Sequence, residues 1–103
     1  MNYLQEIQNW YHSECNDEWE HVYGITIDTL DNPGWTVSID LYGTSLQNSE
    51  FQKIEYGYDN EVDSDEWFIC EKKESKFIGN GGPHKLEEII KLFIEWKNEE
   101  KTR

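Results

Sequence analysis

The stretch YGITIDTLDNPGWTVSIDL, Tyr23 to Leu41, decides the fold. Apolar residues alternate with polar ones on both sides of a turn signal, with Ile25 and Ile27 before it and Val37 and Ile39 after it. A period of two is typical of strands that bury one face. We therefore predict a β-hairpin in which Ile27 lies opposite Val37 or Ile39.

Asn32-Pro33-Gly34-Trp35 supplies the turn signal. Proline fixes the second position and glycine allows a positive φ at the third, which predicts a type II turn. Trp35 then becomes the first inward residue of the second strand and closes the end of the core. An exposed aromatic at a loop tip is the alternative. The same register points Asp28 and Asp40 outward.

The other helices and strands are predicted from the spacing of apolar residues and from the residues that interrupt regular structure. Leu4, Ile7 and Tyr11 have helical spacing, which predicts a short helix from Tyr3 to Tyr11 capped by Asn2. Further strands are predicted at 51–58 and 67–70, with a hairpin return at 76–78. His12 to Asp17 is polar and predicts a turn.

Gly79-Asn80-Gly81-Gly82 predicts the end of the strand region, and Pro83 suits the first position of a helix. The inward face of that helix is predicted to carry Leu86, Ile89, Ile90, Phe93 and Trp96 or Lys97, with a frayed tail after Lys97. We therefore expect an α+β fold: a single domain, residues 1–103, with an antiparallel four- to five-stranded sheet and N-terminal and C-terminal helices packed on one face.

Charge is distributed unevenly along the chain. The net charge is -13, and residues 1–52 hold nine acidic residues without a single Lys or Arg. Such a field opposes direct binding to nucleic acid and to anionic membranes, and it speeds association with basic proteins. The charge also fits a surface that simply keeps the protein in solution. No stretch has the length and hydropathy of a membrane span or a signal peptide, so we expect a cytoplasmic protein.

Catalytic and metal-binding motifs are weak. One short span of the sequence contains His12, Cys15 and His21. A zinc site needs four ligands, and a reactive thiol needs basic surroundings. We therefore expect neither a metal nor a cofactor. In the acidic loop 59–66, a calcium-binding pattern that starts at Asp59 would need glycine and glutamate where this chain has Ser64 and Cys70. Residues 79–82 lack a phosphate-binding fingerprint. We predict reduced cysteines and no enzymatic activity.

Several blocks, taken together, resemble immunity protein 53, a predicted immunity family of bacterial polymorphic toxin systems. They are residues 10–11, 15–25, 29–35 and 39–41, followed by Gly81-Gly82-Pro83 before an aromatic-rich helix. The resemblance covers nearly the whole chain. The family pattern usually has Asp-Gly-Asp before Trp-Glu-His, where this chain has Asn16-Asp17-Glu18.

The resemblance implies a bacterial protein that binds a cognate toxin domain and blocks it. We expect the toxin to be basic, a nuclease being the leading candidate, because an acidic inhibitor can fill a cationic substrate groove. We expect this protein to be a monomer or a weak dimer. The residues expected at the interface are Asp17, Glu18, Trp19, Glu20, His21, Asp28, Asp31, Asn32 and Asp40, with Trp19 as the aromatic anchor.

Two alternatives from other classes stay open at this point. One is a small thiol-dependent enzyme of unknown substrate that uses Cys15 with His12 or His21. The other is an acidic adaptor or nucleic-acid mimic that binds some other basic protein.

Overall fold

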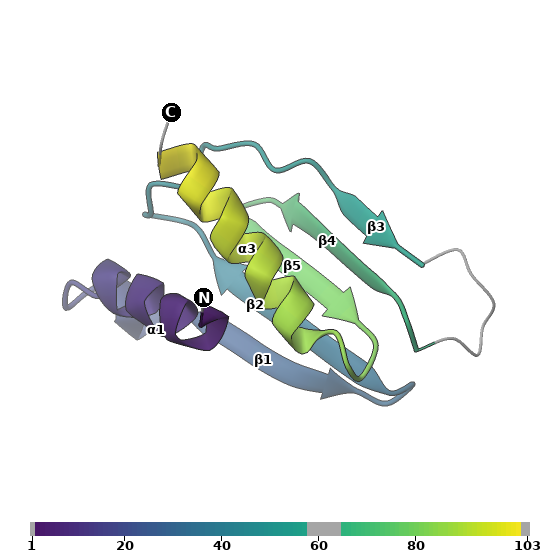
Figure 1. Ribbon diagram of the computed structural model, residues 1–103. Helices are drawn as coiled ribbons and strands as arrows, with labels where there is room; N and C mark the ends of the chain where they lie inside the picture. Colours follow the sequence, from purple (N-terminus) through teal and green to yellow (C-terminus); the bar gives the residue numbers. More distant parts are fainter. Residues whose placement is uncertain (1, 58–64, 102–103) are drawn as a thin grey trace.

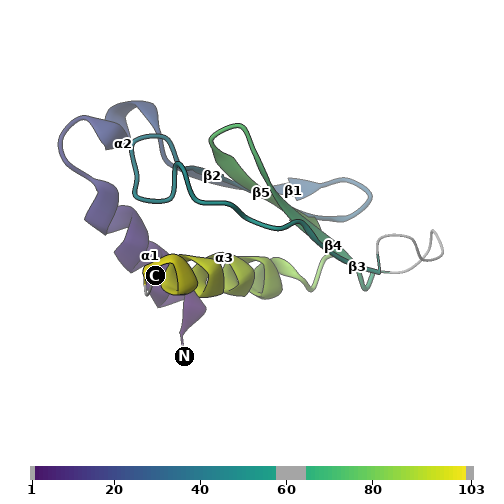
Figure 2. The ribbon, with the colours of Figure 1, turned by 90° about the horizontal axis from the view of Figure 1, so that it is seen from above.

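Five antiparallel strands form one open sheet, and the two long helices lie on the same side of it (Figure 1 and Figure 2). The structure is a computed structural model and describes residues 2–57 and 65–101. Its strands run in the spatial order β1-β2-β5-β4-β3. The predicted α+β fold class is confirmed. The elements are α1 (Tyr3–Glu14), α2 (Trp19–Val22), β1 (Ile25–Leu30), β2 (Gly34–Asp40), β3 (Ile54–Tyr56), β4 (Phe68–Lys73), β5 (Lys76–Gly81) and α3 (Leu86–Lys101).

The central hairpin forms in the predicted register. Ile27 pairs with Val37 and Ile25 pairs with Ile39, so the inward side chains of β1 and β2 share one face. We call this face the helix side, because Val37 and Ile39 are buried there beneath α3. The opposite face, which we call the outer face, is covered by neither α1 nor α3 (Figure 2).

The predicted type II turn is wrong. Leu30 pairs with Gly34, so the loop consists of Asp31, Asn32 and Pro33, with a cis peptide bond between Asn32 and Pro33. Gly34 is the first residue of β2, and its φ is not positive. Glycine is needed there for space, because a Cβ would overlap the carbonyl oxygen of Gly81 on β5.

The glycines at 79 and 81 continue β5 where we predicted its end. A Cβ on Gly79 would overlap Cγ2 of Ile89, so the missing side chain lets α3 lie directly on the sheet. Pro83 lies in a turn and is not the first helical residue, because α3 begins only at Leu86. Trp35 points inward as predicted, and its Nε1 donates to the carbonyl of Pro83 at 3.0 Å.

The N-terminal helix is capped as predicted but is longer and buries a different face. Asn2 accepts a hydrogen bond from the amide of Gln5, and the helix continues to Glu14. Ile7 and Trp10 are its buried residues, whereas Leu4 is 59% exposed. The reason is that α1 packs mainly on α3, where Trp10 meets the ring of Phe93 edge to face.

The C-terminal helix is confirmed, and its buried residues are Ile89, Ile90, Phe93, Ile94 and Trp96. It continues to Lys101, beyond the predicted fraying point, because Trp96 is anchored: its Nε1 donates to the carbonyl of Glu50. The third strand, predicted at 51–58, is shorter among the described residues and is β3. Most of the predicted acidic loop, residues 59–64, lies outside the described residues.

Candidate partner-binding surface

The connection between α1 and α2 is an acidic loop that holds itself in place. The side-chain oxygen of Asn16 accepts from the amides of Glu18 and Trp19, at 3.0 and 2.9 Å. In return, the Glu20 carboxylate accepts from the amides of Asn16 and Asp17, at 2.8 Å each. These bonds satisfy the amides of four successive residues, 16 to 19, the last of which begins α2. The loop therefore presents its remaining side chains from a fixed backbone.

The electrostatics of this loop follow from those hydrogen bonds. Backbone amides, its own first and then those of Asn16 and Asp17, lower the pKa of Glu20 below its ordinary value. The Glu20 carboxylate is thus engaged in hydrogen bonds within the loop. Its neighbours Asp17, Glu18 and His21 are exposed and are available to a partner.

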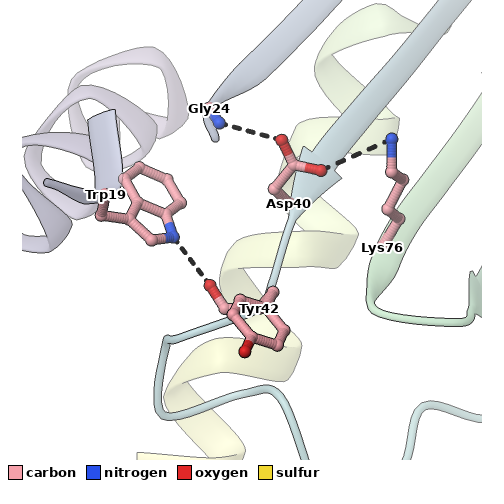
Figure 3. A network of polar contacts seen from close by, with 5 residues as sticks. All are labelled: Trp19, Gly24, Asp40, Tyr42 and Lys76. Atoms are coloured by element: carbon pink, nitrogen blue, oxygen red, sulfur yellow. Dashed lines mark hydrogen bonds and ion pairs between the residues drawn. The ribbon is translucent and has the colours of Figure 1, made fainter. Parts of the chain in front are cut away.

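Trp19, the expected aromatic anchor, lies in the core with 6% of its surface exposed. Its ring packs edge to face on Trp10 with centroids 6.0 Å apart, and its Nε1 donates to the carbonyl of Tyr42 at 2.8 Å (Figure 3). The ring therefore attaches the acidic loop to the chain that leaves β2. It is not presented on the surface.

Asp40 lies on the outer face, but its carboxylate is engaged within the protein (Figure 3). One oxygen accepts from the amide of Gly24 at 2.9 Å, and the other lies 3.5 Å from Nζ of Lys76 on β5. The Asp40 amide also donates to the carbonyl of Gly24. Asp40 thus fixes the entry into β1 against the end of β2.

The hairpin carries the other expected interface residues. Asp28 points to the outer face and is exposed, as are Asp31 and Asn32 at the turn. The strand β1 starts beside α2 and runs away from it, so the turn lies at the far end of the sheet (Figure 2). Six strand residues span about 20 Å. The structure therefore separates the expected residues into a group at the acidic loop and a group along the hairpin.

Within residues 2–57 and 65–101, no three His, Cys, Asp or Glu side chains are grouped so that they could hold an ion. The Cys15 thiol donates to the carbonyl of Tyr11 at 3.3 Å. Burial, and then the nearby Glu88 charge, raise the pKa of the Cys70 thiol to about 12.

A shallow groove that the sequence analysis missed lies between residues 48–55 and the second half of α3. Its volume is about 1130 Å³. Leu92 and Trp96 contribute apolar surface, and the amine of Lys72 is turned to the carbonyls of Gln47 and Ser49. Glu50, Glu55, Glu95, Glu99 and Glu100 also line it. The sequence signal was the four-residue spacing of Glu95 and Glu99, which places both on one side of a helix.

The family described as immunity protein 53 matches residues 4–98. This chain belongs to that family. Comparisons with curated proteins and with solved structures gave no match. Membership of an immunity protein family indicates a toxin-neutralising role, with a cognate toxin as partner.

The Asp-Gly-Asp pattern expected from the resemblance has glycine where this chain has Asp17. Asp17 occupies its place and has a φ of +73°, in the left-handed region that glycine adopts without strain. The loop therefore carries an acidic side chain on a left-handed backbone. In the part of the chain that the structure describes, no helix is long and apolar enough to cross a membrane.

Proposed function

We propose that this immunity protein neutralises its cognate toxin by binding it, without catalysis, and that the toxin is a nuclease with a basic substrate groove. The family match over residues 4–98 supports toxin neutralisation. The charge distribution carries the rest of the proposal, since the first 52 residues contain nine acids and no Lys or Arg. A negative surface approaches a nucleic-acid-binding groove quickly and excludes the polyanion that belongs there.

The contact surface in this proposal is the hairpin, with the acidic loop as its neighbour. Asp28, Asp31 and Asn32 are exposed along β1 and the turn, and Asp17 and Glu18 are exposed at the loop tip. The side chains of Glu20 and Asn16 hold the acidic loop by hydrogen bonds, and the Asp40 carboxylate holds the start of β1 in the same way. Both parts of the surface are therefore rigid. Rigid presentation lowers the entropy lost on binding. Two free cysteines, Cys15 and Cys70, agree with a cytoplasmic site of action.

The thiol-dependent enzyme has less support. A nucleophilic cysteine must form a thiolate near neutral pH, and a pKa of about 12 keeps Cys70 protonated. The charged sequence neighbours of Cys15 are acids, among them Glu14, Asp17 and Glu20, whereas reactive cysteines occur in basic surroundings. Cys15→Ala should therefore leave toxin neutralisation unchanged.

Co-purification and inhibition assays with the toxin domain encoded beside this gene test the proposal. We expect a complex at micromolar concentration in low salt and loss of the toxin's nuclease activity in that complex. A panel of unrelated basic nucleases is the comparison, because inhibition of all of them would indicate a general nucleic-acid mimic. A toxin domain that neither binds this protein nor loses activity beside it contradicts the proposal.

A further inference from the structure

The strand β1 lies at one edge of the sheet. It pairs with β2 on its inner side, and among the described residues no strand pairs with its outer side. An edge strand leaves every second backbone amide and carbonyl without a partner in the sheet. These groups can pair with an extended segment from another protein.

The hydrogen-bond pattern identifies the outward groups. The amide of Asp40 donates to the carbonyl of Gly24, so Gly24 and every second residue after it bond toward β2. The amides and carbonyls of Ile25, Ile27 and Thr29 therefore point to the free edge. Thr29 agrees with this assignment, because its amide donates to the side chain of Asp28 at 2.7 Å.

The side chains beside this edge differ between the two faces of the sheet. On the helix side, Ile27 is 42% exposed, although its cross-strand partner Val37 is buried. On the outer face, Thr26 and Asp28 are exposed. An added strand would meet an apolar side chain on one face and a carboxylate on the other.

The edge also lacks the features by which sheets avoid such pairing. Residues Ile25 to Leu30 contain no Lys and no Pro, and they pair with β2 without interruption. Asp28 is the one charge in the strand, and its carboxylate is turned to the edge amide of Thr29. The strand is held at both ends, by Asp40 at Gly24 and by the hairpin turn.

We propose that the outer edge of β1 accepts an extended, positively charged segment of the toxin as a sixth strand of the sheet. In this arrangement the toxin backbone bonds to Ile25 and Ile27, a basic side chain meets Asp28, and an apolar one covers Ile27. The inference rests on the proposed toxin-neutralising function and specifies how the two proteins dock.

Charge selects this occupant over a second copy of the same chain. Each copy carries a net charge of -13, so two copies repel each other, whereas a basic segment is attracted to the same edge. The absence of Lys and Arg from residues 1–52 leaves no cation in the hairpin to balance the carboxylates of a second copy.

A proline substitution tests the backbone contact. Ile27→Pro removes an amide that points to the edge, and proline is tolerated at such positions of edge strands. Ile27→Thr keeps that amide and a β-branched side chain, and so is the matched control. With the adjacently encoded toxin domain as probe, we expect Kd to rise at least tenfold for Ile27→Pro and only a few-fold for Ile27→Thr. Equal affinity of Ile27→Pro and the parent protein overturns the inference.

Hydrogen exchange on the unmodified protein gives a second readout that does not depend on the proline variant folding. The amides of Ile25 and Ile27 should exchange at least tenfold more slowly in the complex than in the free protein. Unchanged exchange at both amides overturns the inference, as does protection that grows with protein concentration in the absence of toxin, which would indicate a second copy. A toxin domain that does not bind the unmodified protein contradicts the proposed function instead.

Discussion

Among the residues that the structure describes, Asp17 and Glu74 are the two non-glycine residues with a positive φ. Asp17 has a φ of +73°, and glycine adopts this region at much lower cost than residues with a Cβ. Asp17→Gly should stabilise the protein by about 0.5–1 kcal/mol and raise Tm by a few degrees. Thermal unfolding measures the change, with Asp17→Asn as the control for the lost charge. A decrease in Tm for Asp17→Gly would show that the Asp17 side chain has a structural role.

Glu20 makes the acidic loop sensitive to acid. Its folded-state pKa is lowered, mainly by hydrogen bonds from its own backbone amide and those of Asn16 and Asp17. A lowered pKa stabilises the fold fully above the unfolded pKa of 4.5, and that contribution is lost as pH falls through the folded value. Urea unfolding between pH 6 and pH 3 should therefore show the difference between parent and Glu20→Gln shrinking as pH falls. Glu95→Gln, on the exposed side of α3, is the control, and a difference that does not change with pH counts against this role.

Sequence reasoning at this scale predicted the cap at Asn2 and the inward position of Trp35, because both depend on neighbours a few residues away. It could not predict that Trp19 is buried. The ring of Trp19 meets Trp10 and the carbonyl of Tyr42, and those contacts arise only when α1 and the end of β2 come together. A Trp flanked by acids fits an interface anchor and a core residue equally well until such long-range contacts are known.

The contact between α3 and the sheet depends on a glycine of β5. A Cβ on Gly79 would overlap Cγ2 of Ile89, which is fully buried. Gly79→Ala should destabilise the fold by about 1–3 kcal/mol through overpacking. Combining it with Ile89→Ala should cost less than the two changes added together, because the second change removes the obstructing atom. Urea unfolding of the four proteins measures the coupling.

Gly24→Ala is the matched control for Gly79→Ala. A Cβ on Gly24 would have its nearest neighbour, Cε1 of Tyr11, at 4.0 Å, which is ordinary contact. We expect this change to alter the free energy of unfolding by less than about 1 kcal/mol. Equal effects at residues 24 and 79 would mean that backbone flexibility, and not the contact with Ile89, explains the result.

At the scale of elements, alternation predicted the hairpin and its register because a one-residue slip would turn Val37 and Ile39 away from the face that carries Ile27. The end of β5 was predicted wrongly because glycine marks both turns and close contacts. At 79–81 it marks contact, since β5 lies between β2 and β4 with α3 packed above it. Only the position of α3 distinguishes the two uses of glycine.

At the scale of the whole molecule, the positions of the acidic side chains in space differ from those expected from the sequence. Nine acids lie in the first 52 residues, and six of them were expected together at the interface. The structure places Asp17 and Glu18 before the start of β1 and Asp31 after its end, and it engages the carboxylate of Asp40 with the amide of Gly24. A charge-reversal test must therefore avoid Asp40, whose loss would disturb the fold itself.

Two charge-matched double variants can locate the toxin contact. Asp28→Lys with Asp31→Lys and Glu87→Lys with Glu95→Lys make equal changes in net charge, on the hairpin and on α3 respectively, and all four side chains are exposed. Both variants should weaken long-range attraction alike, but only the hairpin pair should add local repulsion, slowing association with the toxin on the order of tenfold more at low salt. Stopped-flow association rates across salt concentrations measure this, and the gap should close as salt rises. If the α3 pair slows association more, the toxin approaches the helix side, where the groove beside residues 48–55 offers the opposing acidic surface.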